Sequence, residues 1–320
     1  MREIDIAVER WPIAGAFTIS RGSRTEATVA VARISADGAT GEGECVPYAR
    51  YGESVESVVA QMRSVADALR RGATRGELQR LLPPGAARNA LDCALWDLEA
   101  AIAGKPLHVL AGLPRPDPVV TAYTLSLGTP ETMLEAAKRA AHRPLLKVKL
   151  GGAGDPDRIA AVREGAPTAR LIADANEGWR EDTLAANLAA CEAAGVELIE
   201  QPLPAGQDGA LAKLSTGIVL CADESIHDHA SLSALPPCYG AINIKLDKTG
   251  GLSDALMLLA AAGERGLKIM VGCMLGTSLG IAPAVLLAQR AQWVDLDGPL
   301  LLAKDREGGL RYEGSVLWPE

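Results

Sequence analysis

Charged side chains recur at regular intervals in the second half of the chain. Lys149, Asp174, Glu200, Asp223 and Lys245 follow one another at spacings of 25, 26, 23 and 22 residues, and each ends a short apolar run. One strand and one helix fit into each interval. Because buried charges are costly unless they are paired or bound to a ligand, this recurrence predicts one functional site rather than unrelated turn residues.

The acidic members of the series predict a metal site. Asp174, Glu200 and Asp223 offer only oxygen ligands, which Mg²⁺ prefers while it keeps positions open for water and substrate. None of the four histidines falls in phase with them, and this disfavours zinc. We therefore expect one Mg²⁺ per site, held by these carboxylates.

Lys149 and Lys245 flank the acidic residues in sequence order. If the apolar runs close into a ring, two amines face each other across a pocket, an arrangement suited to removing a proton from one face of a carbon and returning it to the other. A lysine with a pKa of about 10.4 is a poor base, so we expect Lys147 and the metal ion to lower that pKa. Lys147 and the metal would also stabilise charge that develops on a substrate carboxylate.

The elements that must position these residues are eight short apolar runs alternating with Ala/Leu-rich amphipathic stretches. The runs span 119–125, 145–149, 171–174, 196–200, 218–223, 241–245, 269–273 and 293–297. Such alternation with short connections predicts a parallel sheet, and eight units close a barrel whose chemistry lies at the carboxyl ends of the strands. The fold class is therefore α/β, a (β/α)7β TIM-like barrel.

The first third of the chain has a different pattern. Alternating residues at 2–9, 28–34 and 40–44 predict an antiparallel meander, and 54–71 and 87–103 have helical periodicity, the latter closed by Gly104 and Pro106. We predict an α+β capping domain over 1–112 and the catalytic barrel over 113–298, joined by the Pro-rich passage 113–118. The segment 299–320 is too short for another unit and is expected to return to the capping domain.

The composition excludes several classes of partner. The chain of 320 residues has a net charge of −8 and no Lys/Arg-rich tract, so nucleic acid is not expected. No run of eighteen apolar residues and no secretion-signal pattern is present, which predicts a cytoplasmic protein without a membrane partner. Homo-oligomerisation stays open.

Several motifs together resemble the enolase superfamily, muconate-lactonizing subgroup. They are Lys147-Val148-Lys149, Asp174-Ala175-Asn176, Glu200-Gln201-Pro202, Ala222-Asp223-Glu224-Ser225, Asn243-Ile244-Lys245 and the segment 88–97. The metal-plus-base logic of that superfamily is well established. The resemblance implies that the first domain caps the barrel mouth and that its loop 19–26 touches the substrate.

Two further features resemble the dipeptide epimerases of that subgroup. Asp295-Leu296-Asp297 is similar to a pair that receives the substrate α-ammonium, and Arg24 is similar to an arginine that holds a glutamate side chain. The resemblance implies a dipeptide substrate, L-Ala-D/L-Glu, epimerised at the glutamyl carbon during murein peptide recycling. Thr124 and Cys273, at strand ends, are expected to contribute to the substrate pocket.

Other functions remain open at the level of sequence. N-acylamino acid racemisation and o-succinylbenzoate synthesis would use the same metal and lysines, although their substrates carry no ammonium for Asp295 and Asp297. A metal-dependent hydrolase would be expected to use histidine ligands or paired metals, and a non-catalytic scaffold would show no proton exchange. The roles of Lys248 and Arg21, and the stereoisomer that each catalytic lysine serves, are left open.

Overall fold

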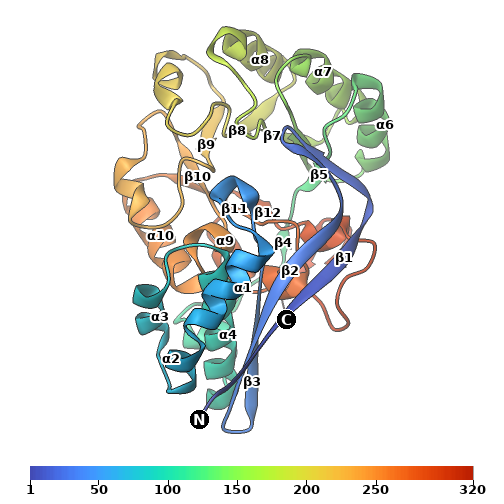
Figure 1. Ribbon diagram of the computed structural model, residues 1–320. Helices are drawn as coiled ribbons and strands as arrows, with labels where there is room; N and C mark the ends of the chain where they lie inside the picture. The colour runs from blue at the N-terminus through green and yellow to red at the C-terminus, as the bar shows by residue number, and fades with distance from the viewer. Residues whose placement is uncertain (320) are drawn as a thin grey trace.

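A three-stranded antiparallel sheet forms the first part of the computed structural model, which describes residues 1–319. Its strands are β1 (Glu3–Ile19), β2 (Gly22–Ala36) and β3 (Ala39–Cys45). β1 and β2 are longer than the sequence predicted, and the expected loop 19–26 is instead a hairpin tip, since Ile19 pairs with Gly22. Figure 1 shows this hairpin reaching across to the β5–β7 side of the barrel, where Thr18 O accepts a hydrogen bond from Leu127 N.

Helices pack against one face of this sheet. They are α1 (Val55–Ser64), α2 (Ala66–Arg70), α3 (Arg75–Leu81) and α4 (Ala86–Ala103), followed by α5 (Leu107–Leu110), with the short 3-10 helix η1 (Ala49–Tyr51) before them. The expected helix 54–71 is split into α1 and α2, and α3 was not predicted. α4 matches its prediction and ends at Gly104, whose φ of 59° allows the left-handed C-cap. Gly41 and Gly43 leave no side chain between β3 and the α4 backbone, so the helix lies close on the sheet.

Eight parallel strands in sequential order form the barrel, as predicted. They are β5 (Tyr123–Leu125), β6 (Leu145–Lys149), β7 (Arg170–Asp174), β8 (Val196–Glu200), β9 (Val219–Ala222), β10 (Ala241–Ile244), β11 (Lys268–Gly272) and β12 (Trp293–Asp295). A hydrogen bond from Ala122 N to Val294 O (2.7 Å) joins the first and last strands. The (β/α)7β fold class is therefore confirmed.

The outer layer of the barrel is uneven. Its α-helices are α6 (Pro130–Ala140), α7 (Asp155–Gly165), α8 (Glu181–Ala193), α9 (Leu246–Thr249), α10 (Leu252–Glu264), α11 (Ser278–Ile281) and α12 (Ala284–Ala288). After β8 and β9 the expected helices are only 3-10 turns, η2 (Asp208–Lys213) and η3 (Ser231–Ala234). Proline and glycine in the segment after β8, including Pro202, Pro204 and Gly206, disfavour a full α-helix there.

The prediction of a single first barrel strand over 119–125 was wrong in one respect, because the structure divides this segment into two strands. Its first part is β4 (Val119–Val120), which pairs not with the barrel but with β14 (Val316–Trp318), itself the partner of β13 (Arg311–Glu313). Earlier in the tail, after α13 (Gly298–Leu301), Leu302 bridges to Ile13 and Ala303 N donates to Pro12 O. The tail thus contacts both the capping hairpin and the barrel, and the domain limits at 112 and 298 stay a prediction. Within residues 1–319 no helix is both long and apolar enough to cross a membrane.

Asp247 lies where the capping domain meets the barrel and gives a testable pH dependence. Its Oδ1 accepts hydrogen bonds from Val46 N (3.0 Å) and Asn89 Nδ2 (2.9 Å), while burial raises its pKa to about 7. An acid whose pKa is raised on folding leaves stability intact below its unfolded pKa of about 3.9 and reduces it as pH rises toward 7. Asp247→Asn keeps the acceptor oxygen, so we expect the variant to gain thermal stability relative to wild type at pH 8 and little at pH 4. Melting curves at both values test this, and an equal difference at the two would contradict it.

Candidate active site

One inward-facing layer of the barrel is apolar and closes its lower end. Each strand region contributes one side chain to it: Ala122, Leu145, Ile172, Leu198, Cys221, Ala241, Met270 and Trp293. These residues are buried and pack together. Such filled layers make a barrel of this kind a packed core and not a pore.

The next inward layer is polar. Because alternate residues of a strand face the same side, it contains Thr124, Lys147, Asp174, Glu200, Asp223, Asn243, Gly272 and Asp295, two positions beyond the apolar layer. Gly272 makes room, since a Cβ there would lie 2.7 Å from the Asn243 side-chain amide. The apolar layer below and the polar layer above place the chemistry at the carboxyl ends of the strands.

The two lysines expected to act as bases lie one inward position beyond this polar layer. The single ring anticipated from the sequence is therefore two adjoining layers, and the lysines reach back toward the carboxylates. Lys149 Nζ lies 2.6 Å from Asp174 Oδ2, and Lys245 Nζ lies 2.6 Å from Asp223 Oδ2. The carboxylate row Asp174, Glu200 and Asp223 consequently lies between the two amines.

Lys147 is at the centre of the polar layer. Its Nζ lies 2.7 Å from Asp295 Oδ2, 2.7 Å from Glu200 Oε2 and 3.1 Å from Asp174 Oδ2, and the residue is 1% exposed. These carboxylates hold the pKa of Lys147 well above its usual range, although burial alone would lower it. Lys147 is therefore a fixed positive charge in this site.

The donor set fits a divalent cation. Asp174, Glu200 and Asp223 are buried carboxylates from neighbouring strands, and Glu200 Oε2 receives no hydrogen bond of good geometry. Within residues 1–319, no three acidic, His or Cys side chains are close enough together to form a complete metal site. Lysine ammonium groups lie against the oxygens of the three carboxylates instead. When one of Lys149 and Lys245 is neutral, as a base must be, the carboxylates of Asp174, Glu200, Asp223 and Asp295 outnumber the three remaining ammonium groups, and a divalent cation would offset that excess.

The pKa of Lys245 depends on the carboxylates that face it, and the lowering expected from a bound metal ion stays a prediction. Burial lowers the pKa of this amine, but the facing carboxylates of Asp223 and Glu200 outweigh burial and hold it well above its usual range. Lys147 opposes them, as predicted, with a smaller effect. For Lys245 to act as a base, the charge of Asp223 and Glu200 must therefore be taken up by another group.

Lys248, whose role was open, is a structural ammonium. It is 1% exposed, and its Nζ donates to Asp223 Oδ1 (2.5 Å), Asp223 O (2.7 Å) and Asn243 O (2.9 Å). All three donor directions are thus used by protein acceptors. Lys248 orients Asp223 and does not reach the cavity described next.

A cavity of about 260 Å³ lies above the site, between the capping hairpin and the barrel. It is lined by Lys149 and Lys245, together with Asp223, Arg24 and Cys273. The apolar part of its wall comes from Ile13, Phe17, Ile19, Ala27, Val46, Met274 and Leu275. Both amines therefore open onto the same cavity, which is large enough for a small molecule.

The other residues expected to bind substrate are buried near this cavity and are absent from its lining. They are Lys147, Thr124, Asp295 and Asp297. Thr124 N donates to Asp297 Oδ2 (2.6 Å), while burial and the neighbouring Asp295 raise the pKa of Asp297 to about 7. Asp174 and Glu200 are likewise fully buried. A role in binding substrate stays a prediction for Lys147, Thr124, Asp295 and Asp297.

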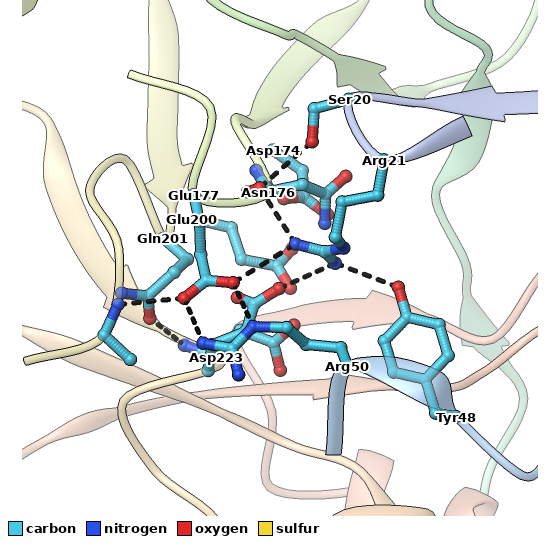
Figure 2. A network of polar contacts seen from close by, with 12 residues as sticks. Ser20, Arg21, Tyr48, Arg50, Asp174, Asn176, Glu177, Glu200, Gln201 and Asp223 are labelled. Carbon is cyan, nitrogen blue, oxygen red and sulfur yellow. Dashed lines mark hydrogen bonds and ion pairs between the residues drawn. The ribbon is translucent and has the colours of Figure 1, made fainter. Parts of the chain in front are cut away.

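Two arginines of the hairpin tip differ in what they can bind. Arg21 donates to Asn176 O (2.9 Å) and Tyr48 Oη (2.9 Å), as Figure 2 shows, and also to Glu224 Oε1 (2.9 Å). The Arg24 side chain forms no hydrogen bond or ion pair with the described residues, and its guanidinium lies 5.8 Å from the Tyr48 ring centroid. The N–H donors of Arg24 are therefore available to a ligand, whereas Arg21 uses its donors for hydrogen bonds within the protein.

Glu177 connects two parts of the capping domain to the barrel. Its carboxylate accepts two hydrogen bonds from Arg50 (2.5 and 2.6 Å) and lies 3.3 Å from Arg21 Nη1 (Figure 2). Asn176 and Glu177 have φ of 45° and 63°, a left-handed backbone that is uncommon for such residues. Contacts from the capping domain therefore hold a strained turn above the carboxylate row.

The sequence reasoning missed Tyr48, Arg50, Glu177 and Glu224 and gave Arg21 no role. Glu224 is 4% exposed, and burial together with neighbouring carboxylates raises its pKa to about 8. Its position directly after Asp223 was a usable signal, because two adjacent acids at a strand end need separate cations. The other residues come from the capping domain or from loops, and nothing in their spacing indicates that they meet.

The comparisons with known proteins agree with this fold. Residues 1–112 match the mandelate racemase/muconate lactonizing enzyme N-terminal domain, and residues 132–300 match the enolase C-terminal domain-like family. The chain therefore belongs to the mandelate racemase/muconate lactonizing enzyme family of the enolase superfamily.

Two curated relatives are particularly similar. The chain is 48% identical over 319 residues to an L-Ala-D/L-Glu epimerase of Escherichia coli K12, with 99% of both chains covered. It is also 44% identical over 281 residues to an N-acetyl-D-glutamate racemase of a Pseudoalteromonas species, covering 87% of this chain and 89% of the relative.

Solved structures show the same similarity. An enolase family member from Agrobacterium tumefaciens, described as homologous to dipeptide epimerases and containing sodium and L-Ala-L-Glu, superposes with a TM-score of 0.98 at 54% identity, covering 100% and 98% of the two chains. A dipeptide epimerase from Methylococcus capsulatus complexed with Mg and L-Arg-D-Lys has a TM-score of 0.88 at 32% identity, covering 99% and 96%.

Proposed function

We propose that the protein is a Mg²⁺-dependent L-Ala-D/L-Glu epimerase, an isomerase that inverts the glutamyl α-carbon of a dipeptide. The observation that carries this proposal is the placement of Lys149 and Lys245 at the two ends of a buried carboxylate row, with both lining one cavity. The similarity to epimerases that have dipeptides bound supports the same conclusion.

The reaction is a 1,1-proton transfer between two amines. One lysine takes the α-proton from its side of the carbon, and the other lysine delivers a proton from the opposite side. The substrate carboxylate carries the developing negative charge, and the fixed ammonium of Lys147 stabilises it electrostatically. Mg²⁺ bound by Asp174, Glu200 and Asp223 would supply further charge stabilisation and neutralise the carboxylates that now pair with the lysines.

The two ends of the dipeptide meet groups of opposite charge. Arg24 is proposed to hold the glutamyl side-chain carboxylate, because its guanidinium lines the cavity and forms no hydrogen bond with the described residues. Asp295 and Asp297 are proposed to receive the α-ammonium, although both are buried and neither lines the cavity. Binding would then fix the direction of the dipeptide across the two amines.

Arg24→Gln is expected to lower kcat/KM for L-Ala-L-Glu by about 10- to 100-fold, the usual cost of losing hydrogen bonds to a charged group. L-Ala-L-Leu has no side-chain carboxylate, so its turnover by the variant should stay close to that of wild type. Steady-state kinetics on both dipeptides measure the difference, with the exposed Arg63→Gln on α1 as the matched control. Equal losses on the two dipeptides would assign Arg24 a role other than side-chain recognition.

N-acetylglutamate racemisation is a second candidate, favoured by the 44% identical racemase. Its substrate shares the glutamyl half and would use Arg24 and the same lysines, but it has no ammonium for Asp295 and Asp297. The two activities therefore separate at the amino-terminal end of the substrate.

The proposed function is tested by supplying L-Ala-L-Glu and N-acetyl-L-glutamate in parallel with Mg²⁺ and separating the isomers by chiral chromatography. We expect L-Ala-D-Glu to form with the higher kcat/KM. Turnover of N-acetylglutamate without turnover of the dipeptide would favour the racemase. A cytoplasmic location and a place in murein peptide recycling belong to the proposal, supported by the nature of this dipeptide and by the absence of any membrane-spanning helix within residues 1–319.

A further inference from the structure

The segment 88–97 of the capping domain is one of the motifs that resemble the enolase superfamily, yet none of its side chains lines the cavity. It forms the middle of α4, and Arg88, Asp92 and Trp96 recur at every fourth position, so they share one face of the helix. Arg88 and Asp92 are 3% and 0% exposed. Buried polar groups remote from the chemistry need a reason, because burying them is costly unless they are bonded.

This helix face grips the turn that follows Lys245. Arg88 donates to Thr249 O (2.6 Å) and Gly250 O (3.1 Å), and it forms an ion pair of 3.2 Å with Asp254. Asn89 Nδ2 donates to Asp247 Oδ1 at 2.9 Å. Both ends of α9 are therefore bound to α4 of the capping domain.

The contacts continue into the start of α10. Asp92 accepts from Ser253 N (2.9 Å) and Ser253 Oγ (2.7 Å), and Trp96 Nε1 donates to the same hydroxyl (3.0 Å). A Cβ at Gly250 would overlap the Arg88 guanidinium, and one at Gly251 would overlap the Asp92 side chain. The turn 246–251 and this face of α4 are therefore in close contact.

Lys245 begins the turn that α4 contacts. It is the N-cap of α9, and its carbonyl accepts hydrogen bonds from Lys248 N and Thr249 N, both 3.0 Å. Lys248 in turn holds Asp223. Lys149 lies at the end of β6, and this strand is not part of the turn 246–251 that α4 contacts.

We propose that Arg88 and Asn89 are positioning residues for one of the two bases: they fix Lys245 through α9 and leave Lys149 unaffected. The inference rests on the proposed epimerase function. A displacement of about 1 Å can cost 10²-fold in rate. Loss of this grip should therefore slow proton transfer on one face of the substrate far more than on the other.

The experiment measures deuterium exchange at the glutamyl α-carbon of L-Ala-L-Glu and L-Ala-D-Glu separately in D₂O with Mg²⁺. Initial rates before inversion define each face, and Lys149→Ala and Lys245→Ala identify which isomer faces which amine. In Arg88→Met, exchange of the Lys245-facing isomer should fall at least about tenfold more than exchange of the other isomer. Arg88→Lys should restore part of the difference, and Asn89→Ala should reproduce it in milder form.

The matched control is Asp97→Asn, on the opposite face of α4, where Asp97 accepts from Glu42 N within the capping domain. Its two exchange rates should stay in the wild-type ratio. Equal losses on both isomers in Arg88→Met and Asn89→Ala, with unchanged melting temperature, would overturn the inference. Asn89→Ala and Arg88→Lys report the same ratio if Arg88→Met fails to fold, whereas failure of the proposed function would appear as absence of exchange in wild type.

Discussion

Replacing either Lys149 or Lys245 by alanine is expected to abolish epimerisation, with a loss of at least about 10² to 10⁴ in rate, the usual contribution of a positioned acid or base. Inversion needs both amines, because the proton leaves one face of the carbon and returns to the other. Exchange needs only one, so a variant that retains one amine can still wash out the α-proton of the isomer facing it. The two variants should therefore retain exchange of opposite isomers, to an extent set by the remaining lysine.

The measurement is the rate of inversion and the rate of α-deuteration for each variant and each isomer. Lys138→Ala is the control, because this lysine is exposed on α6 and pairs with Glu135 on the same helix. Retained inversion in either alanine variant would show that one of the two amines is not a base. If both variants lost exchange of the same isomer, the opposed arrangement would be wrong.

Glu200→Gln is expected to remove Mg²⁺ binding and to lower turnover by about 10² to 10³, comparable to losing a preorganised electrostatic group. Glu200 lies in the middle of the carboxylate row, is 0% exposed, and accepts from Asn243 Nδ2 at 2.7 Å. The amide preserves the size of the side chain but not its charge. Wild type at a Mg²⁺ concentration of 100 times Kd should gain about 2.7 kcal/mol of stability, and the variant should gain almost none.

Thermal unfolding with and without Mg²⁺ tests this binding independently of turnover. Glu197→Gln provides the control, because Glu197 lies near the start of the same strand, where it pairs with Arg170 at 2.7 Å and accepts from Trp293 Nε1 of the apolar layer at 3.3 Å. A Mg²⁺ response in Glu200→Gln equal to that of Glu197→Gln would exclude Glu200 as a metal ligand.

The barrel and its polar row were predictable because they follow from local periodicity. Strands of four or five residues in a parallel sheet put residues of equal phase beside one another, and Lys149, Asp174 and Glu200 are successive Cα partners in the observed register. Asp223 follows by the same rule, two residues beyond Cys221, the partner of Glu200. One strand and one connecting segment per charged residue were enough to bring together groups separated by almost a hundred residues, even though the connections after β8 and β9 contain only 3-10 turns.

What escaped prediction depends on contacts between distant segments. The guanidinium groups of Arg24 and Arg21 both lie near the Tyr48 ring, but Tyr48 Oη, Glu224 and the 176–177 turn accept hydrogen bonds from Arg21. Likewise, Asp223 and Glu200 raise the pKa of Lys245 because the lysine reaches back to them from the layer above, and a pKa lowered by Mg²⁺ stays a prediction. Neither effect has a signature in the spacing of residues along the chain.

The account depends most directly on proton transfer at the glutamyl α-carbon, and NMR of the wild-type protein with L-Ala-L-Glu and Mg²⁺ in D₂O measures it. We predict that the α-proton signal disappears while L-Ala-D-Glu accumulates with deuterium at that carbon. An unchanged α-proton signal, or cleavage of the dipeptide into free alanine and glutamate, would contradict a function as an epimerase that uses two opposed amines.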